Sequence, residues 1–175
     1  MGNKEGKNMN KKIKKIAILS ILMALGVVLK FFSIGTGDFR ISFWDIPLFM
    51  AGVIAGPIYG GIVALGADLI YGLCFSTYPF SFIMMFTTII WGVAGGIFKY
   101  LKINKLTLIP LFLVVLGTSI TSTVINSIYL ILYYGFESML LKLPLRLLVL
   151  VIKWPITTML VYVLYKSVFS KVKNI

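Results

Sequence analysis

Six long apolar runs, separated by short polar or glycine-containing segments, make up most of this chain. Most of them approach the roughly 20 residues that a helix needs to cross the hydrocarbon core of a bilayer. The pattern therefore predicts an all-α integral membrane protein, a bundle of six transmembrane helices. The predicted helices lie at about residues 13–33, 45–56, 58–75, 82–101, 108–133 and 145–169.

The segment 37–61 joins a charged edge to a helix start and a regular glycine spacing. Asp45 is a favourable N-cap residue, and Pro47 is tolerated in the first turn that follows it. Three glycines then recur every four residues: Gly52, Gly56 and Gly60. This spacing is typical of closely packed membrane helices, and the Gly-Pro pair that starts at position 56 also signals a break. We interpret the segment as the lip and one wall of a ligand pocket at a membrane surface.

The polar segments outside the runs predict tails and loops. Residues 1–12 and 170–175 are expected to form basic tails, the first of them disordered, around a bundle of residues 13–169. Three connections are expected on the side opposite the tails: 34–44, 76–81 and 133–144. The first and third connections are long enough to close over a pocket.

Composition supports a lipid environment. Hydrophobic residues make up 59% of the 175 positions, and the mean hydropathy is +1.01, above the 45–50% apolar content of soluble domains. The length allows one domain. There is no histidine and there are only five carboxylates, so we expect no metal site, no cofactor and no general base of the common kind.

The net charge of +12 arises mainly from lysines that fall on one side of the predicted topology. They stand before the first run, in the connection near residues 99–105, and at the C-terminal end. This is the positive-inside pattern, which predicts cytoplasmic N- and C-termini in a multi-pass plasma-membrane protein. The pattern explains the charge without nucleic-acid binding, and contact with anionic lipid is a further expectation.

Polar side chains inside apolar runs are the strongest candidates for function. Asp68 is a carboxylate among Ile, Val, Ala, Leu and Gly, and Asn126 follows a hydroxyl-rich stretch. An intramembrane acid costs about 2.5–3.5 kcal/mol by insertion scales. Asp68 is therefore either a structural carboxylate paired to an amide or a base, or a ligand contact or proton relay.

Small residues on the first run form a narrow strip. Ser20 and Ala24 are four residues apart and lie on one helix face, where small side chains permit close helix packing. The strip either packs inside the protein or contacts a partner membrane protein. The chain also lacks a phosphate-binding GxxxxGK[ST] loop and any nucleophile–base motif, so we expect a binding protein that obtains its energy elsewhere and is not an enzyme.

Several segments together resemble a known family. They are the LSILMALGVVL run, FRISFWDIPLFMAGVIAGPIYGG, GADLIYG, VINSIYLILYYG and LPLRLLVLVIKWPI, within residues 13–165. They are similar to the substrate-binding S components of energy-coupling factor (ECF) vitamin transporters, folate branch. The resemblance implies a six-helix bundle that binds a vitamin from the outer face. It also implies docking onto a transmembrane coupling protein that carries two ATPase subunits, with Ser20 and Ala24 in the docking strip.

The resemblance to the folate branch also implies a ligand site. Folate is a planar pterin joined to a benzoyl-glutamate dianion, so two arginines are expected to hold carboxylates. Asp68 and Asn126 are expected to read the pterin edge, and three aromatic residues to supply flat faces. The expected ligand-binding residues are Arg40, Ser42, Trp44, Asp68, Tyr71, Asn126, Tyr129 and Arg146.

The sequence departs from the family pattern at two points near this site. Trp44 stands where family members often have glycine, and the loop around Tyr78 lacks an expected Gly-Pro-Tyr-Phe-Pro-Gly-Phe segment. Alternative ligands are therefore pantothenate, riboflavin or a queuosine precursor. A small membrane enzyme acting on lipid and a structural subunit without a ligand are alternatives from other functional classes.

Overall fold

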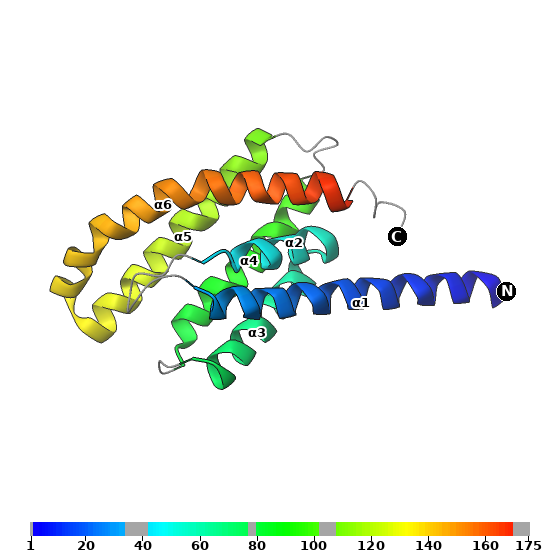
Figure 1. The fold of residues 1–175 in the computed structure, drawn as a ribbon, viewed down its shortest axis with the longest axis horizontal. Coiled ribbons are helices and arrows are strands. Elements are labelled where there is room, and N and C mark those ends of the chain that lie inside the picture. The colour runs from blue at the N-terminus through cyan, green and yellow to red at the C-terminus, as the bar shows by residue number, and fades with distance from the viewer. Residues whose placement is uncertain (1, 34–41, 77–79, 102–107, 170–175) are drawn as a thin grey trace.

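The computed structural model describes residues 2–33, 42–76, 80–101 and 108–169, which are helical apart from short connections and contain no strand. Figure 1 shows the helices gathered in one bundle, so the predicted all-α, six-helix architecture is confirmed. The elements are α1 Gly2–Phe31, α2 Asp45–Ala55, α3 Pro57–Cys74, α4 Phe82–Tyr100, α5 Leu108–Tyr134, α6 Phe136–Leu164 and the short π-helical η1 Tyr165–Phe169.

Four of these helices, α3 to α6, are long and apolar enough to cross a membrane. The other two differ for separate reasons. Helix α2 has 11 residues and is about 16 Å long, half the thickness of a hydrocarbon core. Helix α1 is long enough, but Lys14, Lys15 and Lys30 lie near the ends of its apolar stretch.

The short helix α2 lies at the centre of the bundle. Leu48 is fully buried with residues of α1 and α3, including Val27 and Ala64. Phe49, the next residue, is fully buried against α4 and joins a second apolar cluster that reaches Val161 of α6. Ten of the eleven residues of α2 are buried, because other helices pack against all of its sides.

The predicted glycine packing is confirmed where α2 and α3 pack on α4. A Cβ atom built on Gly52 or Gly60 would overlap the backbone oxygen of Gly92, and one on Gly95 would overlap the backbone of Phe49. Only glycine allows the backbones to approach this closely. Gly56 instead forms the turn between α2 and α3, with φ of +97°, a conformation that favours glycine.

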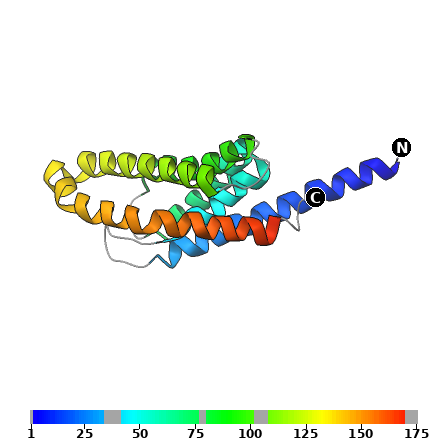
Figure 2. The ribbon, with the colours of Figure 1, turned by 90° about the horizontal axis from the view of Figure 1, so that it is seen from above.

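The N-terminal end of α1 and the C-terminal end of η1 lie at the same end of the bundle (Figures 1 and 2). Helix α1 begins at Gly2 and projects beyond the other helices there (Figure 2). A disordered segment was expected at 1–12, so the helix begins earlier than predicted. Lysine and glutamate are good helix formers, and extending an existing helix avoids the cost of nucleation.

The predicted third outer loop at 133–144 is wrong. Helices α5 and α6 are joined at Gly135, whose φ of +83° makes the turn, and α6 runs on through Pro144 and Pro155. The residues after Gly135 are mostly Leu, Met, Glu and Lys, which favour helix. The two helices are about 40 Å long and extend as a hairpin beyond the rest of the bundle (Figure 1).

The predicted N-cap of α2 is displaced by one residue. Trp44 occupies the cap position, and no side chain in the described part of the chain caps it. Asp45 is the first helical residue, and its carboxylate faces α6, where it pairs with Lys153. An acidic residue in the first turn still interacts favourably with the helix dipole. Its carboxylate, however, forms a tertiary contact with Lys153 instead of capping α2.

Candidate functional site

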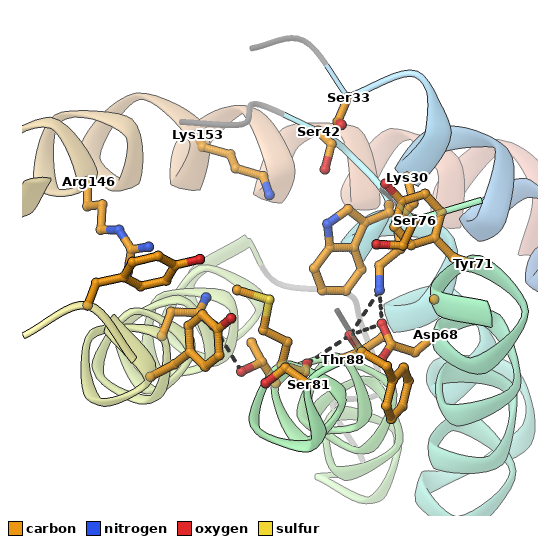
Figure 3. Close-up of a pocket in the computed structure, with 18 residues that line it drawn as sticks. Lys30, Ser33, Ser42, Asp68, Tyr71, Ser76, Ser81, Thr88, Arg146 and Lys153 are labelled. Carbon is orange, nitrogen blue, oxygen red and sulfur yellow. Dashed lines mark hydrogen bonds and ion pairs between the residues drawn. The ribbon is translucent and has the colours of Figure 1, made fainter. Parts of the chain in front are cut away.

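A cavity of about 320 Å³ opens at the end of the bundle opposite the N-terminal end of α1 (Figure 3). Its walls are the last turns of α1, α3 and α5, the first turns of α4, the residues before α2 and the middle of α6. Volumes of about 300–1,000 Å³ are usual for small-molecule sites. We call it the outer cavity.

Seven of the eight predicted ligand-binding residues line the outer cavity. They are Ser42, Trp44, Asp68, Tyr71, Asn126, Tyr129 and Arg146. Arg40 lies outside the described residues, so its role stays a prediction. The structure thus brings together residues from α3, α5, α6 and the segment before α2 that are far apart in the sequence.

Asp68 has a partner that the sequence analysis did not identify. Lys30, on the last turn of α1, forms an ion pair with its carboxylate, and both side chains are about 10% exposed. The Thr88 hydroxyl on α4 donates to Asp68 Oδ1 at 3.0 Å and accepts from Lys30 Nζ at 3.2 Å. Asp68 is therefore paired with a base, as expected for a structural carboxylate. Figure 3 shows Lys30, Asp68 and Thr88 on one wall of the cavity.

A second buried acid faces the opposite wall. Asp45 is fully buried, and its Oδ1 lies 3.1 Å from Lys153 Nζ on α6. The Thr157 hydroxyl, one turn further along α6, donates to Asp45 Oδ2 at 3.5 Å. This pair attaches the central helix α2 to α6 and holds the Lys153 side chain at the cavity.

Trp44 stands between the two lysines. Its ring centroid lies 4.6 Å from Lys30 Nζ and 5.9 Å from Lys153 Nζ, within or near the range of cation–π attraction. Trp44, which stands where family members often have glycine, therefore lies close to a lysine on each of the two walls. Its ring offers a flat apolar surface whose surroundings are positively charged.

The lining of the outer cavity contains more basic than acidic side chains, although Lys30 is paired with Asp68 and Lys153 with Asp45 behind the wall. Among its described residues, three are basic (Lys30, Arg146 and Lys153) and one, Asp68, is acidic. Lys30 and Lys153 were not predicted as site residues. The spacing of seven residues between Arg146 and Lys153 is two helical turns, so it could have shown that both lie on one face of α6. No comparable signal in the sequence marks Lys30.

The small-residue strip of α1 faces away from the bundle. Ser20 and Ala24 are both exposed, together with Ala17 one turn earlier. The alternative that this strip packs inside the protein is therefore wrong for the described residues. In a membrane these side chains face lipid or another protein, and docking stays a prediction.

Comparisons with known proteins identify the family. The family model "ECF transporter, substrate-specific component" matches residues 14–169. The chain is 27% identical over 161 residues to the folate transporter FolT of Clostridium novyi (strain NT), which covers 90% of this chain and 91% of that protein.

Two solved structures share the fold. A crystal structure of FolT bound with folic acid superposes with a TM-score of 0.79 at 30% identity, covering 90% of this chain and 97% of that one. The S component of a bacterial ECF transporter superposes with a TM-score of 0.65 at 21% identity, covering 93% and 99%, and supports the fold alone. The family match over nearly the whole chain, together with this fold, shows that the protein belongs to the substrate-specific components of ECF transporters.

Proposed function

We propose that this chain is the folate-binding S component of an ECF importer. It is a multi-pass membrane protein of the transporter family and not an enzyme. The observation that carries the proposal is the outer cavity, where three basic side chains and one acidic one surround aromatic walls. Similarity to FolT and to a structure of FolT with folic acid supports the choice of ligand.

The chemistry of folate fits this lining. Its glutamate carries two carboxylates, which favour a site with an excess of cations, and Arg146 offers a planar fork suited to a carboxylate. The aromatic walls include Tyr71 and Tyr129, and flat rings suit a planar ligand. Arg40 remains a proposed further carboxylate contact at the mouth of the cavity.

Folate is captured from the outer face and delivered inward through an ECF module. The outer cavity opens opposite the end that carries the first turns of α1, and the positive-inside rule assigns the lysine-rich end to the cytoplasm. The module consists of a transmembrane coupling protein and two ATPase subunits, which supply the energy of transport.

Folate bound during expression is expected to remain in the purified protein. A folate-type ligand held inside a cavity leaves slowly, so protein purified in detergent from folate-containing medium should show a pterin absorbance band that protein from folate-free medium lacks. Denaturation should release the absorbing compound into the filtrate. Identification of a flavin in that filtrate would contradict the choice of folate.

Bulky substitutions in the strip of α1 are expected to block assembly. Ala24→Trp or Ser20→Trp should abolish co-purification with the ECF module and leave folate binding intact, since a close helix crossing accepts only small side chains. Gly117→Trp on α5 is the matched control, because a Cβ atom there meets nothing described within 4 Å. Normal assembly of Ala24→Trp would overturn this docking site.

A further inference from the structure

The ammonium group of Lys30 is surrounded by side chains from three other parts of the chain. Asp68 on α3 forms an ion pair with it, and the Thr88 hydroxyl on α4 accepts a hydrogen bond from it at 3.2 Å. The ring centroid of Trp44, just before α2, lies 4.6 Å from Lys30 Nζ, and that of Tyr71 on α3 lies 5.6 Å away. One carboxylate, one hydroxyl and two aromatic rings therefore surround a single cation.

We call the four surrounding residues the cation cage: Trp44, Asp68, Tyr71 and Thr88. All four line the outer cavity, and Figure 3 shows the Lys30 nitrogen joined to Asp68 and Thr88 by dashed lines. Asp68 and Tyr71 are three residues apart, so both project from one face of α3. Aromatic faces within about 6 Å of a cation are a means by which proteins recognise free ammonium ligands, and here a carboxylate adds the opposite charge.

We propose that the cation cage is an ammonium-binding site that the chain fills with its own Lys30, and that Lys30 thereby excludes cationic ligands from the outer cavity. Asp68 is the one acidic residue among the described residues that line this cavity. While Lys30 is bound to it, a cationic ligand finds no free carboxylate there and also meets Arg146 and Lys153. Removal of the Lys30 side chain opens the cage to an amine from solution.

The space that Lys30→Ala would leave matches a simple amine. Alanine keeps the Cβ atom of lysine, and n-propylammonium supplies the methylene carbons and the nitrogen that the substitution removes. The side chains of Lys30 and Asp68 are both about 10% exposed, so water is a poor replacement for the lost cation. The amine can reach the cage through the outer cavity, because Lys30 is itself part of the cavity lining.

The test measures thermal unfolding of the full-length protein in detergent as n-propylammonium is added. The unfolding temperature of Lys30→Ala should rise by about 3–6 °C when the amine reaches about ten times its dissociation constant, and the rise should follow a binding isotherm. The wild-type protein should not respond, because its cage is filled. Lys30→Ala/Asp68→Asn should not respond either, because it lacks the carboxylate that attracts the amine.

Three further comparisons separate binding in the cage from general effects of the amine. 1-Propanol is similar in size but uncharged, and it should leave the unfolding temperature of Lys30→Ala unchanged. Lys166→Ala, which removes an exposed lysine of η1, should not respond to the amine. Adding Trp44→Leu to Lys30→Ala should weaken binding of the amine about two- to thirtyfold, the worth of one cation–π contact.

The exclusion of cations is tested directly by isothermal titration with benzylammonium, which carries an aromatic ring and a positive charge. It should bind to Lys30→Ala and should not bind to the wild-type protein. Binding to both proteins with equal affinity would show that Lys30 does not exclude cationic ligands, and binding to neither would show that the cage accepts no free amine. Both of these results would overturn the proposal.

The thermal experiment decides the proposal even where a variant folds poorly. Recovery of folded Lys30→Ala only from buffers that contain n-propylammonium supports the cage. A Lys30→Ala protein that ignores the amine, or that stays unfolded in it while Lys30→Ala/Asp68→Asn folds, overturns the cage. Failure of both variants to fold also overturns it, since the loss would not then come from an unpaired carboxylate.

The cation cage goes beyond the proposed function and does not depend on folate being the ligand. The two can therefore fail separately. Stabilisation of Lys30→Ala by the amine, in a protein whose wild-type form binds no folate, would reject the proposed function and support the cage. Folate binding by the wild-type protein, with no response of Lys30→Ala to the amine, would reject the cage alone.

Discussion

Gly52→Ala is expected to destabilise the bundle by about 3 kcal/mol or more, the upper end of overpacking costs. The added methyl group would overlap backbone atoms of Gly92 and Gly96 on α4, and backbone cannot move aside as a flexible side chain can. Because α2 is enclosed on all sides, its displacement would also disturb the wall of the outer cavity. Thermal unfolding in detergent measures the change.

The control for this experiment is Gly117→Ala, at a glycine where a Cβ atom meets nothing described within 4 Å. It should unfold at the wild-type temperature or slightly above, since alanine is a better helix former than glycine. A Gly52→Ala protein with wild-type stability would show that α2 and α4 are not packed through their glycines.

Lys30→Met is expected to lower the free energy of unfolding by about 3–5 kcal/mol, because it leaves the Asp68 carboxylate buried without its cation. Lys30 and Asp68 are both about 10% exposed, so water cannot easily replace the lost partner. The double variant Lys30→Met/Asp68→Asn should recover most of the loss, since the neutral amide can still accept from Thr88. Chemical or thermal unfolding of the three proteins measures the effect.

An exposed lysine provides the comparison. Lys166→Met, on η1, should change the unfolding free energy by less than about 0.5 kcal/mol. Equal stabilities of Lys30→Met and the wild-type protein would mean that Asp68 is not paired as described, and its role in the outer wall would have to be abandoned.

Local sequence pattern was enough for the number and order of the helices, though not for the start of α1 or α6, and for much of the site. The spacing of Gly52 and Gly60 predicted close packing, and both lie against α4. Polar residues in apolar surroundings, such as Asp68 and Asn126, were recognisable because burying them in lipid is costly. Both line the outer cavity.

Partners that depend on tertiary structure were not predictable from the chain alone. Lys30 and Asp68 are 38 positions apart, and only the packing of α1 beside α3 brings them together. No motif around Lys30 marks it as the partner of Asp68, because Lys30 is followed by two further apolar residues of the same run. The loop predicted at 133–144 is helical on both sides of Gly135, which makes the turn, and Pro144 lies inside α6.

Isothermal titration of the purified protein with folate, in the presence and absence of EDTA, tests the central claim most directly. The account predicts stoichiometric binding without ATP that EDTA does not alter, and no displacement of folate by excess pantothenate or riboflavin. The basis is a cavity with three basic lining residues and, among the described residues, no cluster of metal-ligating side chains. Absence of folate binding, strict dependence on a metal ion, or displacement by another vitamin would contradict it.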